Sequence, residues 1–573
     1  MSAKQALSMQ VVKPAAPTAA WRSVWRSPGA SLLHVAIAIA AGYLQACSVA
    51  TPWDGQPLWW LQIISLAALV ALLQRTPSVK GAAALGWLFA ITWLTASTWW
   101  LYISMHTFGG LAAPLAALAV LALSGFLALY YAVACGFSKK IGLFSDAGIG
   151  KFAMVFAFSW LLAELARDTW FTGFPWAAGG YAHLDGPLAH SASVWGVYGI
   201  GFVACGLAAL LAMAHRLRTW RAALGAGASL VALAGVCVLA TLANTDATGL
   251  LSFTQTVVLD RDALPKNVKV FTQAHVQRTR VALLQGNIPQ GEKFDTTKGV
   301  PEALNWYAQQ LSQSTATLVV APETAIPLLP QQLSPDYWAA LQQRFATGTQ
   351  AALIGIPLGD YDQGYTNSVI ALAPPAKLPG AVNVMQPQPY RYDKHHLVPF
   401  GEFTPALFKW FTRMMNIPLG DFNRGAVGQA SFDWAGQRWA PNICYEDLFG
   451  DELAARFVNE AQAPTVLVNV SNIGWFGNSI AIDQHLHISR MRALELGRPM
   501  LRATNTGPTV IIDHHGQVTH SLARHTRGVL LGQVEGRTGT TPYAWWAGRL
   551  GLWPLWLVAV AVLTAAWLRR KKP

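Results

Sequence analysis

Three side chains that could do chemistry together follow strand-like or loop segments in the second half of the chain. Glu323 comes directly after LVVAP, Lys394 lies within YRYDKHHLVPFGEFTP, and Cys444 follows RWAPNI. A carboxylate near a thiol can accept its proton, and a lysine ammonium can stabilise negative charge on a carbonyl oxygen. We therefore predict that the three residues form one nucleophilic site, in which Lys394 also favours the thiolate.

Cys444 needs this support, because a lone thiol is more often an inert buried residue than a nucleophile. The other four cysteines lie in long apolar segments, where small packing roles are expected: Cys47, Cys135, Cys205 and Cys237. Cys444 therefore has no partner for a disulfide in its own domain, and no C-x-x-C or zinc-ligand pattern surrounds it. Only the presence of Glu323 and Lys394 elsewhere in the domain argues that Cys444 is catalytic.

The segments that must position these residues alternate between strand and helix. Val- and Leu-rich runs predict strands at 280–288, 316–326, 351–358, 366–373, 463–472, 499–504 and 509–513. Apolar residues at helical spacing predict helices at 300–314, 334–348, 451–461 and 482–498. This alternation predicts an α/β domain with helices covering sheets. Residues just beyond strand ends in such a domain project into a crevice.

The composition points to a membrane protein that carries this domain. Of the 573 residues 53% are hydrophobic and only 12% charged, and 25 are tryptophan. A soluble protein would have a charged fraction of about 25%. A large soluble enzyme with an unusually apolar core is the weaker alternative.

Eight apolar runs are long enough, or nearly so, to cross a bilayer, which takes about 17–25 residues. They cover 31–50, 58–74, 81–103, 111–136, 151–166, 193–214, 222–243 and 550–568. The run 151–166 is the least secure of them, because it is short and contains Glu164 near its end.

Lysine and arginine in the short loops predict the orientation. Every basic cluster falls on one side: Arg22 and Arg26, Arg75 and Lys80, Lys139 with Lys140 and Lys151, Arg216 with Arg218 and Arg221, and the tail at 569–572. The opposite loops 51–57 and 105–110 contain neither residue. We therefore expect these boundaries: a cytoplasmic extension 1–30, a bundle of seven spans 31–244, an outside domain 245–549, an eighth span 550–568 and a basic tail 569–573. In a bacterium the outside space is the periplasm.

The motifs of the outside domain resemble the nitrilase superfamily. They are APETAIP, KHHLVPFGEFTP, ICYED and VNVSNIGWFG followed by QHLHISRMRALELGRP. With spans before and after, the chain is similar to the family of apolipoprotein N-acyltransferases. The resemblance implies a four-layer α-β-β-α sandwich seated on a polytopic helical membrane bundle.

The resemblance also implies roles for individual residues. Glu323 matches the general base, Lys394 the lysine that stabilises the oxyanion, and Cys444 the nucleophile. Three further positions match residues that support the site or flank the nucleophile: Glu402, Tyr445 and Glu446. The alternative for Glu402 and Glu446 is that they only cap or pair locally. Phe294 departs from the pattern, because tryptophan is expected there, and this bears on substrate fit.

The implied reaction moves an acyl chain between two lipids. A membrane phospholipid, typically phosphatidylethanolamine, loses its sn-1 chain to Cys444 as a thioester. The α-amino group of a diacylglyceryl-modified cysteine at the start of an apolipoprotein then takes the chain. We expect an inner-membrane monomer that needs no metal or cofactor. We also expect it to bind no nucleic acid, because much of the net charge of +13 lies in the inside loops.

Two segments are candidates for lipid contact. Residues 403–422, which include Trp410, mix aromatics, methionines and basic residues, and we interpret them as a lipid-facing lid. An ordinary buried helix explains that segment equally well. Trp475 and Phe476 are expected to line the acyl pocket, and the aromatic stretch 170–176 to lie at the membrane interface.

Two other functions compete with acyl transfer. A membrane-anchored amidase could use the same triad and pass its acyl group to water, although seven spans are excessive for an anchor. A transporter or receptor should carry charged or broken-helix sites near mid-bilayer. The spans contain almost none, with Glu164 the chief exception, and a binding protein has no use for the triad.

Overall fold

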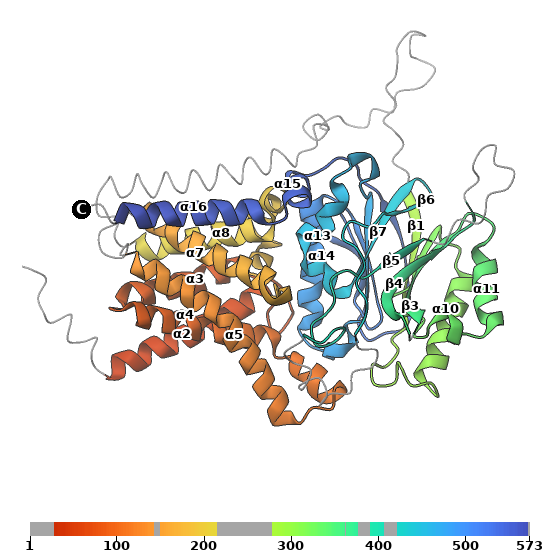
Figure 1. Cartoon of the computed structure of the whole chain (residues 1–573), viewed down its shortest axis with the longest axis horizontal. Helices are drawn as coiled ribbons and strands as arrows, with labels where there is room; N and C mark the ends of the chain where they lie inside the picture. The colour runs from red at the N-terminus through yellow and green to blue at the C-terminus, as the bar shows by residue number, and fades with distance from the viewer. Residues whose placement is uncertain are drawn as a thin grey trace, which may run out of the picture.

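The computed structural model describes residues 28–141, 149–214, 278–360, 362–375, 390–405 and 421–570. A helical bundle forms one end of an elongated molecule and an α/β domain forms the other (Figure 1). The predicted span 222–243 and most of the predicted lid, including Trp410, lie outside the described residues.

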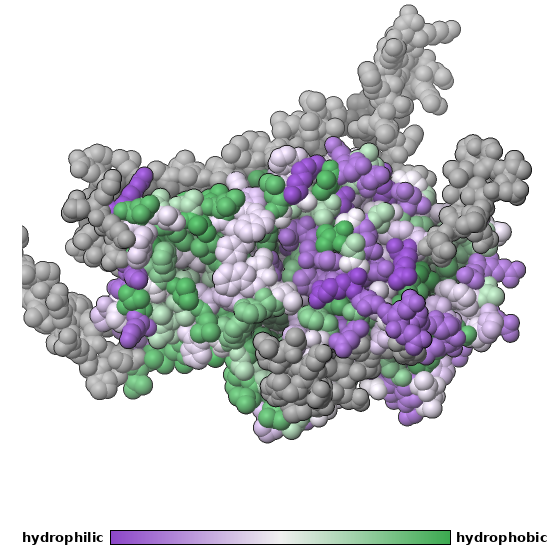
Figure 2. Space-filling model, viewed as in Figure 1, coloured by the Kyte–Doolittle hydropathy of each residue, from purple (hydrophilic) through white to green (hydrophobic). Residues whose placement is uncertain are grey.

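The bundle is built from long apolar helices. They are α2 (Pro28–Val49), α3 (Trp59–Arg75), α4 (Val79–Thr98), α5 (Ala113–Lys140), α7 (Ile149–Thr169), α8 (Ala192–Met213) and α16 (Trp553–Arg570). Hydrophobic residues dominate the visible surface of this end, whereas hydrophilic residues gather on the α/β domain (Figure 2). Such a surface is expected where lipid rather than water surrounds the helices.

Four described helices, α2, α4, α5 and α8, are long and apolar enough to cross a membrane. A fifth span is possible if α15 (Pro542–Leu550) and α16 count together, but they are bent by 86°. α3 has only 17 residues, and α7 contains Lys151, Glu164, Arg167 and Asp168. The number of eight spans therefore stays a prediction.

Two six-stranded sheets form the centre of the α/β domain. One has the order β12-β1-β2-β3-β4-β5 and the other β11-β10-β9-β8-β7-β6. The strands of the first are β1 (Arg278–Gln285), β2 (Leu318–Val320), β3 (Ala351–Asp360), β4 (Gly364–Leu372), β5 (Arg391–Asp393) and β12 (Gly528–Glu535). Those of the second are β6 (Phe432–Trp434), β7 (Gln437–Ile443), β8 (Val466–Ser471), β9 (Met500–Thr504), β10 (Thr509–Ile512) and β11 (Val518–Leu522).

Helices cover the outer face of each sheet and complete four layers. The helices α10 (Gly299–Gln313) and α11 (Pro335–Phe345) lie at the far end, while α13 (Gly450–Ala454) and α14 (Ala481–Leu496) lie between the second sheet and the bundle (Figure 1). Residues such as Val320 and Val468 pack in one apolar core between the sheets. The predicted α-β-β-α sandwich is confirmed.

Two predicted elements are shorter than the sequence suggested. The strand expected over 316–326 ends at Val320, because Pro322 lacks an N–H for the ladder and Thr324 has a left-handed φ of +48°. The helix expected over 451–461 has only five α-helical residues, followed by 3₁₀ turns at Ala455–Phe457 and Glu460–Gln462. The first departure creates the turn that carries Glu323.

α14 attaches the sandwich to the bundle. Gln484 accepts hydrogen bonds from the indole N–H groups of Trp100 (3.1 Å) and Trp176 (2.7 Å), and it donates to the Ser97 carbonyl (3.1 Å). All these side chains are buried. Because buried polar groups need partners, this amide fixes the contact between the two parts of the molecule.

We expect Gln484→Leu to weaken this contact. The substitution leaves the buried Trp176 N–H without its acceptor, whereas the Trp100 N–H and the Ser97 carbonyl keep each other as partners at 2.8 Å, so we expect a cost of about 1–3 kcal/mol. Thermal unfolding in detergent should begin at a lower temperature than in the exposed α10 control Gln309→Leu. Equal unfolding temperatures for the two variants would contradict the role given to Gln484.

Candidate active site

Cys444 stands at the turn where β7 ends. Its backbone has a left-handed φ of +52°, and a 3₁₀ turn runs from Cys444 to Leu448. A non-glycine residue in this conformation is uncommon and is held there by its surroundings. β7 lies parallel to β8, so the thiol follows the carboxyl end of a strand, where α/β folds place their crevices.

The carboxylate of Glu323 is held by three donors. Oε1 accepts from Asn367 Nδ2 (2.7 Å) and Lys394 Nζ (3.2 Å), and Oε2 accepts from the backbone N–H of Asn472 (2.8 Å). Burial opposes ionisation, but Lys394, Asn367 and the nearby Lys293 outweigh it and hold the pKa of Glu323 below its ordinary value. Glu323 is therefore ionised at neutral pH and able to accept a proton.

Lys394 follows β5 and bridges two carboxylates. Its Nζ lies 3.2 Å from Glu323 Oε1 and 2.8 Å from Glu402 Oε1, and the lysine is 1% exposed. Burial alone would lower its pKa, yet the two carboxylates raise the pKa of Lys394 above its ordinary value. Glu402 also accepts from Asn367 Nδ2 (2.9 Å) and the Val398 N–H (2.9 Å), so it secures the loop beyond Lys394.

The thiol of Cys444 lies within the electrostatic field of this cluster. Burial, reinforced by the charge of Glu323, raises the pKa of Cys444 to about 12, although Lys394 acts in the opposite direction. Lys394 thus favours the thiolate, as predicted, but burial and the charge of Glu323 outweigh its effect on the pKa of Cys444. The physical reason is that Glu323 and Glu402 already compensate the ammonium. The proton must instead leave as the thiol attacks.

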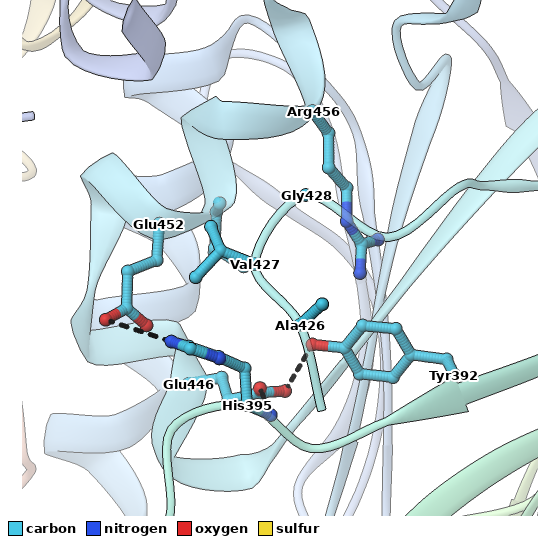
Figure 3. A pocket seen from close by; sticks show the side chains of 9 residues that line it. Tyr392, His395, Ala426, Val427, Gly428, Glu446, Glu452 and Arg456 are labelled. Atoms are coloured by element: carbon cyan, nitrogen blue, oxygen red, sulfur yellow. Dashed lines mark hydrogen bonds and ion pairs between the residues drawn. The ribbon is translucent and has the colours of Figure 1, made fainter. Parts of the chain in front are cut away.

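Glu446 acts on the backbone that carries both Cys444 and Lys394. Its carboxylate accepts from the N–H groups of Ile443 (2.7 Å), His395 (2.6 Å) and His396 (3.2 Å) and from the Tyr392 hydroxyl (2.8 Å). Figure 3 shows Glu446 and Tyr392 facing each other in a small pocket. With these donors around it, Glu446 ties the end of β7 to the segment after β5.

Tyr445 connects the nucleophile's turn to the bundle. Its hydroxyl donates to the carbonyl of Gly173 (3.1 Å), within the aromatic stretch 170–176. The same loop accepts a 2.9 Å hydrogen bond from His396 Nε2 at the Thr172 carbonyl, and Phe171, Thr172 and Gly173 all have left-handed φ angles. The stretch 170–176, which was predicted to lie at the membrane interface, therefore contacts Tyr445 beside Cys444 and His396 near Lys394.

The predicted acyl-pocket residues lie between the site and the bundle. The Trp475 ring lies 6.4 Å from that of Phe294 and 5.9 Å from that of Phe108, which belongs to the π-helix η1 (Ile103–Phe108). Phe476 packs on Trp100, with ring centroids 4.2 Å apart. Trp475 and Phe476 thus form an aromatic contact with the bundle, and their binding of an acyl chain stays a prediction.

His485 supports the carbonyl of the nucleophile and was missed in the sequence. A guanidinium can only donate, so the 2.9 Å contact from Arg502 means that His485 Nδ1 accepts. The proton of the neutral ring therefore lies on Nε2, which donates to the Cys444 carbonyl at 3.1 Å. Burial and the nearby Arg502 lower the pKa of His485 well below its ordinary value, so the ring stays neutral.

Lys293, Asn367 and Asn472 were also missed, although Asn472 lies within the motif VNVSNIGWFG, because a single lysine or asparagine has many ordinary structural roles. Lys293 immediately precedes Phe294 and was overlooked as a loop charge, yet its Nζ donates to the Glu323 carbonyl at 3.1 Å. Among the residues that the structure describes, no group of three His, Cys, Asp or Glu side chains is arranged to hold a metal ion.

Two family models match the chain. The model described as "Apolipoprotein N-acyltransferase N-terminal domain" covers residues 41–210, and the model described as "Carbon-nitrogen hydrolase" covers residues 280–543. The second range contains the whole candidate site, from Lys293 to Arg502. The first lies within the bundle.

Curated relatives match nearly the whole chain. The apolipoprotein N-acyltransferase of Verminephrobacter eiseniae is 55% identical over 94% of this chain and 95% of its own. That of Ralstonia nicotianae is 42% identical over 98% of both chains. Among solved structures, a carbon-nitrogen hydrolase from Helicobacter pylori matches 49% of this chain and 95% of its own at 14% identity, with a TM-score of 0.33.

Proposed function

Because this chain belongs to the apolipoprotein N-acyltransferase family, we propose that it transfers an acyl chain from a membrane phospholipid to the α-amino group of an apolipoprotein's first cysteine. The observation that carries the mechanism is the cluster of Glu323, Lys394 and Glu402, whose charges act on the thiol of Cys444. The chain serves lipoprotein maturation in a bacterial membrane.

The first half-reaction loads Cys444. Glu323 takes the thiol proton as the sulfur attacks the sn-1 ester carbonyl of the phospholipid, which we take to be phosphatidylethanolamine. The oxyanion forms beside Lys394 and the backbone N–H of Tyr445. When the ester C–O bond breaks, Glu323 gives its proton to the departing alkoxide oxygen, so that a lysophospholipid alcohol is released and a thioester remains on Cys444.

The second half-reaction removes the acyl chain from Cys444. The α-amino group of a diacylglyceryl-cysteine has a pKa of about 8, so a useful fraction is neutral at physiological pH. As this amine attacks the thioester, Glu323 accepts its proton and returns it to the departing sulfur of Cys444. The product amide is more stable than the thioester, which makes the transfer favourable.

The placement in the membrane follows from the substrates, since both are lipids. We propose the boundaries of a cytoplasmic segment 1–30, seven spans within 31–244, a periplasmic catalytic domain 245–549, a span 550–568 and a cytoplasmic tail 569–573. The loop-charge pattern supports this orientation. The polar surface of the α/β domain and the contact of α14 with the bundle are consistent with a catalytic domain resting on the bilayer.

Mass spectrometry of the purified protein after incubation with phosphatidylethanolamine tests the proposal. We expect a hydroxylamine-sensitive acyl mass on the peptide that contains Cys444, accompanied by lysophospholipid, and neither product with Cys444→Ala. Addition of a diacylglyceryl peptide should then discharge the adduct as the N-acyl peptide.

Two results would overturn the proposal in different ways. A folded protein that forms neither adduct nor lysophospholipid does not use a phospholipid donor. A thioester that water discharges as fast as the peptide does would instead identify a membrane-anchored hydrolase.

A further inference from the structure

Lys293 is a second buried lysine beside the candidate base. It lies in the turn between β1 and α10 and is only 2% exposed. Its Nζ donates to the backbone carbonyl of Glu323 at 3.1 Å. Within the described part of the chain, no carboxylate lies within 4.0 Å of this ammonium, so it has no ion-pair partner to explain its burial.

The charges of the site do not balance without it. Lys394 is shared by the carboxylates of Glu323 and Glu402, at 3.2 and 2.8 Å, which leaves one negative charge uncompensated in a buried cluster. Buried charges are costly unless they are paired. The cations that act on Glu323 are Lys394 and Lys293, so Lys293 in its protonated form balances the charge of this cluster.

We propose that Lys293 is a positioning residue of the acyl-transfer reaction, whose ammonium anchors the Pro322–Thr324 turn and keeps Glu323 in its proton-accepting form. The inference rests on the proposed function. It adds a second lysine that acts through Glu323 and does not touch the substrate.

The charge of Lys293 affects the pH at which Glu323 becomes protonated. Burial lowers the pKa of Lys293 to about 7, with Glu323 and Cys444 opposing the decrease, so the ammonium is charged throughout the acidic range where Glu323 titrates. The other charged groups facing Glu323 are Lys394, Glu402 behind that lysine, and the Cys444 thiol when ionised. Removing the Lys293 charge should therefore raise the pH at which Glu323 becomes protonated.

The pH dependence of Cys444 alkylation by iodoacetamide measures the protonation of Glu323 without any lipid substrate. The acid limb of its rate reports the proton that the Glu323–Cys444 pair binds at low pH. Peptide mass spectrometry of full-length protein in detergent follows the Cys444 peptide alone, between about pH 4 and pH 8. The variants are Lys293→Met, Lys293→Gln and the exposed control Lys298→Met, which removes the same charge five positions along the chain.

We expect the acid limb to move up by about one pH unit in both Lys293→Met and Lys293→Gln, with a rate on the order of tenfold lower on the limb and little change near pH 8. Lys298→Met should follow the wild-type curve. The glutamine keeps a donor for the Glu323 carbonyl, so it also provides a variant if the methionine protein does not fold.

Three results would overturn the inference. They are an unmoved limb in both variants, a rate reduced equally at every pH, and a wild-type curve restored by Lys293→Gln, which would mean that only the hydrogen bond matters. Because iodoacetamide needs no phospholipid, a displaced limb in a protein that forms no acyl adduct would sustain the role of Lys293 while the proposed function falls.

Discussion

Lys394→Met is expected both to destabilise the α/β domain and to slow acylation of Cys444 strongly. The methionine leaves the carboxylates of Glu323 and Glu402 buried without the ammonium that lies 3.2 and 2.8 Å from them. Removing one partner of a buried ion pair costs about 3–5 kcal/mol, because an uncompensated charge remains. Loss of the group that stabilises the oxyanion should slow acyl-enzyme formation by about 10²–10³-fold.

A second substitution separates the two effects. In Lys394→Met/Glu402→Gln one of the orphaned charges is also removed, so unfolding in denaturant should return toward the wild-type midpoint while acylation stays slow. This non-additivity is expected for groups in direct contact. Full acylation by a folded Lys394→Met protein would contradict the role proposed for the lysine.

Glu323→Gln is expected to remove the proton acceptor with little change in shape. The pKa of Cys444 is raised to about 12, chiefly by burial, so almost no thiolate exists at neutral pH without a base. We expect single-turnover acylation to fall by about 10²–10⁴-fold, the range typical for a positioned base. Because the remaining rate depends on free thiolate, it should rise about tenfold per pH unit toward the pKa of the thiol.

The wild-type protein should instead show a plateau at neutral pH, since Glu323 is already ionised there. The exposed carboxylate Glu460 supplies a matched control, and Glu460→Gln should keep both the rate and the plateau. A Glu323→Gln protein with a wild-type plateau would show that another group takes the proton.

The chemistry was accessible from sequence because Glu323 and Cys444 follow strand-like segments and Lys394 lies within the motif KHHLVPFGEFTP. Lys394 and Cys444 come directly after β5 and β7, and Glu323 comes three residues after β2. The apolar runs that predict such strands are short-range signals. The motifs around them also carried the resemblance on which the predicted sandwich depended. A residue that follows a buried strand needs no tertiary information to become a candidate.

The electrostatics of the site could not be predicted in this way. Whether Lys394 activates Cys444 depends on how many carboxylates share the ammonium, and Glu402 and Glu323 reach it from different loops. Lys293 looked like any loop lysine until the turn between β1 and α10 packed beneath Glu323. A pKa depends on burial and on charges that are distant in sequence, and both arise only when the chain is folded.

From the sequence, seven of the twelve described strands, the four main helices of the α/β domain and a membrane-bound class of protein could be predicted, since periodicity and composition are local properties. Which polar groups meet depends on the tertiary structure. It placed Gln484 between two tryptophans of the bundle and His485, the next residue, on the carbonyl of Cys444. Neighbouring residues on one helix point in different directions, so α14 can hold the bundle with one side chain and the nucleophile with the next.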